Sequence, residues 1–288
     1  MKPEPITIAK LRKRYHKEIC TRILGSRSGV PNLADISSKT SKILAIGMVK
    51  RLGFPLCNDP PVGQTVGTLF AEITMDFLNN CFKLLSHIRP GEWVFSASQA
   101  SVGIAAFEQY EHLADLATVL KIHKDLAATL GVDYIIKPDI VIGRQPLADN
   151  EINVSWNILG NKDISTLTPL RENNYDHPKP ILHASISCKW TIRSDRSQNT
   201  RTEALNLIRN RKGKTPHICS VTAEPMPTRL ASLAMGTGDI DCVYHMALPE
   251  LAASVRESKN EDQEDMLITL IKGKRLRDIT DLPFDLAS

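Results

Sequence analysis

Apolar residues recur at helical spacing through most of the first half of the chain, among polar and basic positions. The segments with this spacing are Ile6 to Leu24, Ser38 to Leu52, Thr68 to Ile88 and Ile104 to Leu130. Turn-forming residues stand between them at 29–32 and 59–63, and Gly131 follows the last segment, where a helix commonly ends. The pattern therefore predicts amphipathic helices as far as residue 130.

Beyond Gly131 the pattern changes to one typical of strands. The runs with strand character are Tyr134 to Ile142, Ile181 to Ile192, His217 to Ala223 and Ile240 to Ala247. In the second run apolar and polar positions alternate, so Ser187 and Lys189 share one face. Helical spacing returns at Thr200 to Asn210 and at Thr228 to Met235. Because helices separate the strands, we predict an α/β fold with a central mixed β-sheet and helices on both faces.

The length of the chain bounds its domain organisation. Its 288 residues, 42% of them hydrophobic, can bury one large core, and we expect a single domain over residues 1–288. Within it, residues 1–130 are mainly helical, residues 131–250 form the sheet core and residues 251–288 form a C-terminal helical segment. Residues 150–180 show little pattern of either kind.

Charge and cysteine usage narrow the classes of function. A net charge of +4 permits nucleic-acid binding without demanding it. The six cysteines include no CxxC pair, which favours buried reduced thiols over a zinc site or disulfides. The first ten residues lack the apolar stretch of a signal peptide, and no run of about 18 apolar residues occurs anywhere. We therefore expect no membrane span and a cytoplasmic location.

Two charged residues stand where the pattern predicts buried strands. Asp139 follows Pro138 in an apolar run, where a carboxylate costs free energy unless a ligand or partner compensates it. Lys189 ends the polar face of the alternating strand. Acidic residues and a lysine at strand ends suit phosphodiester hydrolysis, because carboxylates can hold Mg²⁺ while the amine orients the attacking water.

A Pro-Asp pair followed by a strand that ends in acid-x-Lys is the pattern of the PD-(D/E)xK nucleases. In this chain Ser187 occupies the acid position. Glu203, on the helix predicted after the strand, could supply the carboxylate from a different backbone position. The alternative is an ordinary Pro-Asp pair, which is common, and a lysine that extends to solvent from a strand end.

Two arginines flank an aspartate just past this strand, at Arg193, Asp195 and Arg196. An arginine can donate two hydrogen bonds to guanine O6 and N7, and an aspartate can accept one from cytosine N4. The trio therefore suits readout of G·C pairs in the major groove. Two alternatives remain open: an exposed ion-pair cluster, or Asp195 capping the helix predicted from Thr200.

These residues belong to a run, HASISCKWTIRSDR at 183–196, that closely resembles the NgoMIV-like, CCGG-recognising family of PD-(D/E)xK restriction endonucleases. Further segments that resemble the family are 87–91, 205–207, 209–213, 221–225, 236–238, 241–245 and 273–276. The resemblance covers most of the chain and is weakest before Pro60 and in residues 150–180. It implies a Mg²⁺-dependent type II restriction endonuclease with a PD-(D/E)xK core.

The resemblance also implies roles for single residues. Asp139 matches the family's metal-binding aspartate, Lys189 its catalytic lysine, and Glu203 its relocated carboxylate, with Asp139 and Glu203 as the metal ligands. Ser187 stands where other nucleases carry the second acid. The matches to base-reading residues are Arg193, Asp195 and Arg196 for the CCGG core, Asp35 and Arg229 for the outer G·C pair, and Gln64 near the minor groove.

One position departs from the family. The family places a further active-site glutamate directly after the phenylalanine that matches Phe70, but here Ala71 holds that place and Glu72 comes one residue later. One residue is a turn of about 100° on a helix. Either the helix is locally rotated so that Glu72 reaches the site, or Glu72 is a solvated helix residue.

The resemblance implies further expectations about target and partners. Because both Asp35 and Arg229 are present, the implied duplex target is GCCGGC, cut after the first G to leave a four-base 5′ overhang. A palindrome demands a two-fold assembly, and the family forms tetramers of two dimers. A cell with such a nuclease needs a cognate DNA methyltransferase to protect its own sites.

Two other functions are compatible with parts of this pattern. A PD-(D/E)xK nuclease of different specificity would share Asp139 and Lys189 without the reading arginines. A DNA-binding protein without catalysis would bind the site and leave the DNA intact, but it has no use for Asp139, Lys189 and Glu203 together.

Overall fold

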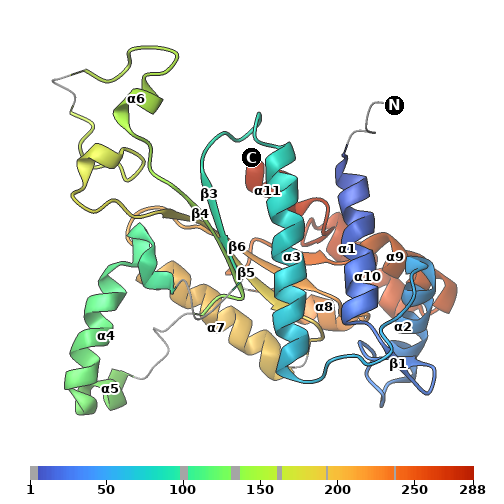
Figure 1. Ribbon diagram of the computed structural model, residues 1–288. Helices are drawn as coiled ribbons and strands as arrows, with labels where there is room; N and C mark the ends of the chain where they lie inside the picture. The colour runs from blue at the N-terminus through green and yellow to red at the C-terminus, as the bar shows by residue number, and fades with distance from the viewer. Residues whose placement is uncertain (1–5, 98–102, 131–136, 161–163, 193, 237) are drawn as a thin grey trace. The chain divides into compact units, whose positions relative to one another are not determined.

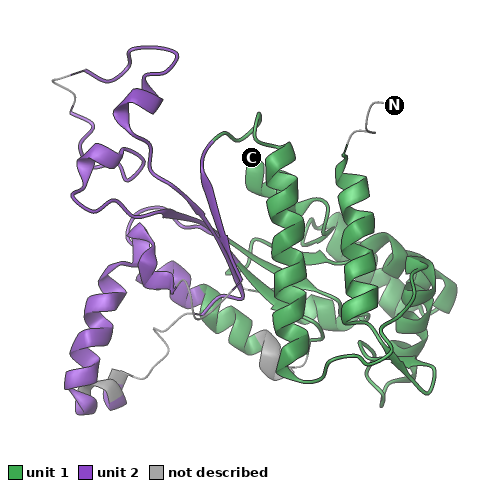
Figure 2. Cartoon of the chain, viewed as in Figure 1, with its two compact units in different colours: residues 1–90, 186–204, 218–288 green, residues 91–185, 205–217 purple. Residues whose placement is uncertain are grey.

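Helices flank a central mixed β-sheet in the computed structural model, as the sequence predicts (Figure 1). The structure describes residues 6–97, 103–130, 137–160, 164–192, 194–236 and 238–288. The chain forms two compact units, shown in different colours in Figure 2. The first unit comprises residues 1–90, 186–204 and 218–288, and the second comprises residues 91–185 and 205–217.

The strands of the sheet follow the order β3-β4-β5-β6-β7-β8. Their bounds are β3 Trp93–Ser96, β4 Ile140–Arg144, β5 Ile181–Lys189, β6 His217–Thr222, β7 Cys242–His245 and β8 Leu276–Asp278. β3 runs antiparallel to β4, whereas β6, β7 and β8 run parallel to one another. β5 is buried from Leu182 to Cys188, so its alternating polar side chains are buried on one face and its apolar ones on the other. Burial on both faces is typical of strands in the middle of an α/β sheet.

The helices of the first unit pack in pairs. They are α1 Ile8–Arg22, α2 Lys39–Leu52, α3 Gln64–Leu84, α8 Pro227–Ala234, α9 Leu248–Ser258, α10 Glu261–Lys272 and α11 Leu282–Ala287. α1 and α11 pack against α3, α2 packs against α9, and α10 packs against both α8 and α9. The strand β8 interrupts the C-terminal helices that the sequence predicts, because Leu276 and Asp278 are buried beside β7.

The contact between α2 and α9 is unusually close at Gly47. A Cβ atom at this position would lie 2.1 Å from the Ser254 hydroxyl oxygen, so a side chain would force the two helices apart. Ser254 donates a hydrogen bond of 2.9 Å to the carbonyl of Leu44. The absence of a side chain at Gly47 thus fixes where α2 lies against α9.

The segment 104–130 is not the single helix that the sequence predicts. Its elements are η1 Ile104–Ala106, η2 Glu108–Tyr110, α4 His112–Ile122 and α5 Lys124–Leu130. Phe107 and Tyr110 are fully buried, and Tyr110 donates to the carbonyl of Leu207. The Gln109 side chain exchanges two hydrogen bonds with the backbone of Leu182. These tertiary contacts favour the two short 3₁₀ turns over a continuous helix, and a break at His123 separates α4 from α5.

Other predicted elements differ at their ends. The short hairpin β1 Ser26–Arg27 and β2 Val30–Pro31 occupies a segment predicted as a turn, and Ser28 and Gly29 turn it with positive φ. The strand predicted from Tyr134 begins at Ile140 instead, and residues 134–136 lie outside the described residues. In and beside residues 150–180, where the sequence shows little pattern, the structure describes two short helices, α6 Asp149–Ile152 and η3 Glu172–Asn174.

The helix predicted from Thr200 is α7 Ser194–Asn210 and begins six residues earlier. Asp195 therefore lies inside the helix, and the alternative that it caps a helix starting at Thr200 is wrong. All six cysteines are free thiols, and the three that the sequence places in core strands, Cys188, Cys219 and Cys242, are buried. Each helix that the structure describes is too short or too polar to cross a membrane.

Candidate functional site

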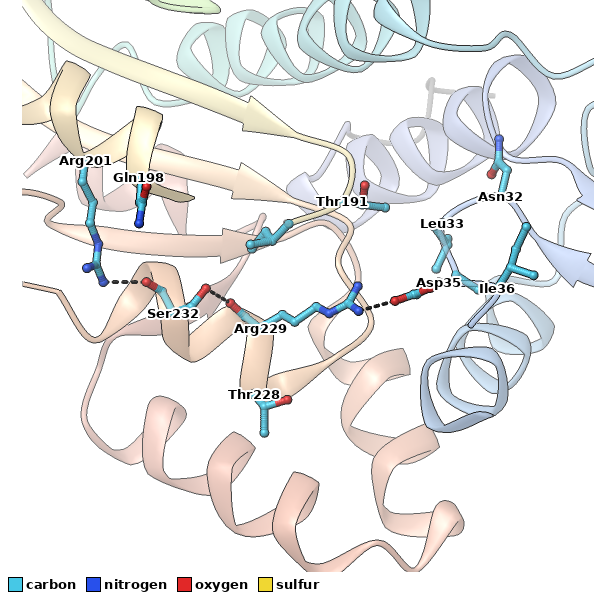
Figure 3. Close-up of a pocket in the computed structure, with 12 residues that line it drawn as sticks. Asn32, Leu33, Asp35, Ile36, Thr191, Gln198, Arg201, Thr228, Arg229 and Ser232 are labelled. Atoms are coloured by element: carbon cyan, nitrogen blue, oxygen red, sulfur yellow. Dashed lines mark hydrogen bonds and ion pairs between the residues drawn. The ribbon is translucent and has the colours of Figure 1, made fainter. Parts of the chain in front are cut away.

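An open pocket of about 1100 Å³ lies in the first unit, beyond the end of β5 (Figure 3). Four parts of the chain form it: the loop before α2, the link from β5 to α7, α7 itself, and α8. Its polar lining includes the side chains of Asp35, Thr191, Gln198, Arg201, Arg229 and Ser232. Two arginines and one carboxylate on the wall of an open cavity suit a polar, charged ligand.

Arg229 and Asp35 form an ion pair on this wall. Asp35 also accepts hydrogen bonds from the Ser37 hydroxyl at 2.7 Å and from the Ser37 backbone N–H at 3.0 Å. The hydrogen bond from the Ser37 hydroxyl holds the pKa of the Asp35 carboxyl well below its usual range, and the contact with Arg229 lowers it further. Both side chains of the pair are partly exposed, so they remain accessible from the pocket.

A chain of contacts links Arg229 to the second arginine of the pocket (Figure 3). Arg201 on α7 donates to the backbone carbonyl of Ser232, and the Ser232 hydroxyl donates to the carbonyl of Arg229 at 2.7 Å. A Cβ atom at Gly236 would lie 3.1 Å from the Arg201 guanidinium, so the turn after α8 closes over this side chain. α7 and α8 are thereby held together beside the pocket.

Glu224 lies behind the ion pair and is a residue that the sequence did not reveal. Its carboxylate is 1% exposed, and one of its oxygens is 4.0 Å from the Arg229 guanidinium. It accepts hydrogen bonds from the backbone N–H groups of Ile192 at 2.8 Å and Met226 at 3.1 Å. Burial raises the pKa of Glu224 to about 7. The sequence does contain one signal that could identify Glu224, because this acidic residue directly follows the largely apolar run His217 to Ala223.

Lys189 and Ser187 lie at the end of β5, in the first unit. Lys189 is half-buried, and its carbonyl accepts from the Ala223 N–H at 3.4 Å. Ser187 is buried, and its hydroxyl oxygen has no hydrogen-bond partner among the described residues. A buried hydroxyl without a partner costs free energy, which indicates that a water or ligand belongs beside it.

The end of β5 packs against α3. Trp190 makes an edge-to-face contact with Phe70, with 5.4 Å between the ring centroids. Ala71, next to Phe70, is buried, whereas Glu72 is half-buried one position further round the helix. Glu203 on α7 is half-buried. These acidic residues and Lys189 belong to the same unit.

The remaining predicted site residues lie elsewhere. Asp139 directly precedes β4 in the second unit and is half-buried. Gln64 is the exposed first residue of α3. Arg193 lies outside the described residues. Asp195 and Arg196 belong to the first turn of α7, and their side chains lie outside the described part of the chain. Within that part, no three acidic, histidine or cysteine side chains form a ready cluster for a metal ion.

Comparison with known proteins gives a family, a relative and a solved structure. The family model described as NgoMIV restriction enzyme matches residues 15–288. The type II restriction enzyme NgoMIV of Neisseria gonorrhoeae is 46% identical over 280 residues, which are 96% of this chain and 97% of that enzyme. A solved complex of the restriction endonuclease PspGI with substrate DNA covers 36% of this chain and 38% of its own, with 19% identity and a TM-score of 0.24.

Proposed function

Because the chain belongs to the NgoMIV restriction enzyme family and is a type II restriction endonuclease, we propose that it cuts both strands of duplex DNA at GCCGGC. Cleavage follows the first G and leaves a four-base 5′ overhang, G^CCGGC. The observation that carries this specificity is the Arg229–Asp35 ion pair on the wall of the open pocket.

One arginine and one aspartate complement one G·C pair. The guanidinium donates to guanine O6 and N7, and the carboxylate accepts from cytosine N4. Arg229 and Asp35 are held side by side with their polar atoms partly exposed, so a base pair that enters the pocket can replace their contact with each other. We assign them to the outer G·C pair of the site.

The core CCGG would be read by a separate set of side chains. Arg193, Asp195 and Arg196 provide two guanine readers and one cytosine reader at the start of α7. Gln64 is exposed at the first turn of α3 and would approach the minor groove.

Asp139 and Glu203 would hold Mg²⁺. Both are half-buried carboxylates, the oxygen ligands that this ion prefers. The bound ion supplies charge stabilisation at the phosphate and a water of lowered pKa. Lys189 would orient the attacking water with its amine. Ser187 stands at the position of the second acid on β5, and Glu203 would supply that carboxylate from α7 instead.

We also include Glu72 in the catalytic set. Its half-buried side chain stands one helix position beyond the buried Ala71, a turn of about 100°, so it would reach the site through a local rotation of the helix.

The palindromic target implies a symmetric assembly. A two-fold axis in the DNA requires two copies of the chain, and we propose a tetramer of two such dimers. A cognate methyltransferase would protect the host's own sites in a restriction-modification system, and both enzymes would work in the cytoplasm, where that DNA lies.

Digestion of a sequenced plasmid with Mg²⁺, followed by mapping of the ends, tests the proposal. We expect fragments that begin with 5′-CCGGC at every GCCGGC and nowhere else. Cuts at other sequences would indicate a PD-(D/E)xK nuclease of different specificity. Intact DNA that is nonetheless bound specifically would indicate a DNA-binding protein without catalysis.

A further inference from the structure

The carboxylate of Glu224 bonds to two parts of the chain that carry proposed base-reading residues. One oxygen accepts from the Ile192 N–H at 2.8 Å, and Ile192 immediately precedes Arg193. The other accepts from the Met226 N–H at 3.1 Å, and Met226 is the residue that precedes α8. A single side chain therefore joins the backbone at Ile192 to the backbone just before α8.

Glu224 also faces the guanidinium that reads the outer base pair. Arg229 lies between two carboxylates, with Asp35 in ion-pair contact on one side and Glu224 at 4.0 Å on the other. If a base pair replaces the contact between Arg229 and Asp35, Glu224 still balances the charge of Arg229. The orientation of Arg229 can thus be kept when the ion pair opens.

The position of Glu224 is itself fixed by its backbone. Its N–H donates to the Thr222 hydroxyl at 3.2 Å, and its carbonyl lies 3.2 Å from Nε2 of His245. Nδ1 of His245 accepts from the Ala247 N–H at 3.0 Å, so Nε2 carries the proton and donates to Glu224. Glu224 is thus anchored to the ends of β6 and β7.

We propose that Glu224 is a positioning residue for specificity, which holds the backbone at Ile192 and the guanidinium of Arg229 in a fixed relation so that the outer pair and the core are read together. This inference rests on the proposed function. It predicts that loss of the carboxylate weakens discrimination between DNA sites more than it weakens binding to DNA in general. The reason is that phosphate contacts dominate affinity, and the buried Glu224 side chain makes no contact with phosphates.

Protonation offers a second way to remove the charge. Burial raises the pKa of Glu224 to about 7, so its carboxylate protonates near neutral pH. The ionisable groups that face it from neighbouring elements are Arg229 on α8, Asp35 in the loop before α2 and His245 on β7. The pKa of Asp35 is held far below neutrality and that of His245 is lowered to about 4, so neither titrates between pH 6 and pH 8.

The test compares Glu224→Gln with the wild type and with Glu250→Gln as a matched control. Glu250 is a half-buried carboxylate, which likewise interacts with an arginine, Arg12, but outside the pocket. The measurement is the ratio of the dissociation constants for a GCCGGC duplex and an ACCGGT duplex, in Ca²⁺ so that no cleavage occurs. We expect Glu224→Gln to reduce this ratio by roughly tenfold, and Glu250→Gln to lower the Tm while leaving the ratio unchanged.

A wild-type ratio in Glu224→Gln overturns the inference and leaves the proposed function intact. A wild-type protein with no preference for GCCGGC overturns the proposed function and the inference with it. If Glu224→Gln does not fold, the ratio is measured in the wild type and in Glu250→Gln from pH 8 to pH 6. We expect it to fall toward pH 6 in both proteins, and a flat profile overturns the inference.

Discussion

Arg229 and Asp35 form an ion pair although 194 positions separate them in the sequence. The fold brings them together because α8 and the loop before α2 border the same pocket. Neither residue is part of the catalytic pattern at Asp139 and Lys189. The residues suited to reading the outer base pair are therefore a different set from the residues suited to chemistry.

Replacement of Arg229 by alanine should relax specificity at the outer base pair. We expect Arg229→Ala to lose roughly 1–3 kcal/mol of binding to GCCGGC and far less to ACCGGT, measured by gel shift in Ca²⁺. Arg277→Ala is the control, because Arg277 pairs with Asp285 outside the pocket and its side chain is 34% exposed, as is that of Arg229. Equal losses for the two duplexes would remove Arg229 from the base-reading set.

Removal of the Asp139 carboxylate should abolish cleavage and spare binding. We expect Asp139→Ala to leave supercoiled plasmid intact with Mg²⁺, while gel shifts in Ca²⁺ still show preference for GCCGGC, because the reading residues are untouched. Asp115→Ala, which changes an exposed residue of the same unit, should cut normally. Wild-type cleavage by Asp139→Ala would contradict its role as a metal ligand.

The relocated carboxylate can be tested by moving it back to the strand. We expect Glu203→Ala to lose cleavage, because no acid on β5 replaces it. Ser187→Asp added to this variant asks whether the site accepts the acid on the strand, and the plasmid assay with Mg²⁺ measures the return of activity. Full activity of Glu203→Ala alone would exclude Glu203 from the metal site.

The buried carboxylate of Glu224 should make stability depend on pH. Its pKa is raised to about 7 from the model-peptide value of 4.5, so protonation stabilises the folded state, and this contribution is lost as the pH rises through 7. Between pH 6.5 and pH 8 we expect the wild type to lose about 1 kcal/mol of unfolding free energy relative to Glu224→Gln, measured by urea denaturation. Parallel profiles for the two proteins would show that Glu224 does not titrate there.

His245 acts in the opposite direction at lower pH. Burial lowers its pKa to about 4, so the stability that its neutral ring provides is present above about pH 6.5 and is lost as the pH falls toward 4. The window above pH 6.5 therefore isolates the contribution of Glu224.

The sequence predicts the strands of the sheet well where buried residues alternate with others or follow one another in a short apolar run. Alternation predicts β5, apolar runs predict β6 and β7, and helical spacing predicts α2 from Ser38, the residue that caps this helix in the structure. Periodicity failed in the segment 104–130, where burial of Phe107 and Tyr110 and the bonds of Gln109 decide the backbone. It also missed the start of α7, because residues 194–199 include no apolar side chain.

The candidate site was predicted unevenly for a similar reason. Lys189 and Asp139 interrupt apolar runs and could be found from the residues themselves, whereas Asp35 and Arg229 entered only through family resemblance. Glu224 was missed because its partners, Ile192 and Arg229, lie on other elements, and no spacing in the sequence connects them. Contacts of this kind depend on tertiary structure and leave no local pattern.

The close approach at Gly47 has a consequence for how new targets could arise. Asp35 stands just ahead of α2, and α2 is seated on α9 through a position where a single methyl group would collide with Ser254. A substitution there would displace the helix and, with it, Asp35, which we propose to read the outer pair, without any change to the proposed base-reading side chains themselves. Variants with altered recognition could therefore be selected from libraries that change the contact between α2 and α9 at Gly47 and Ser254, rather than the proposed base-reading residues.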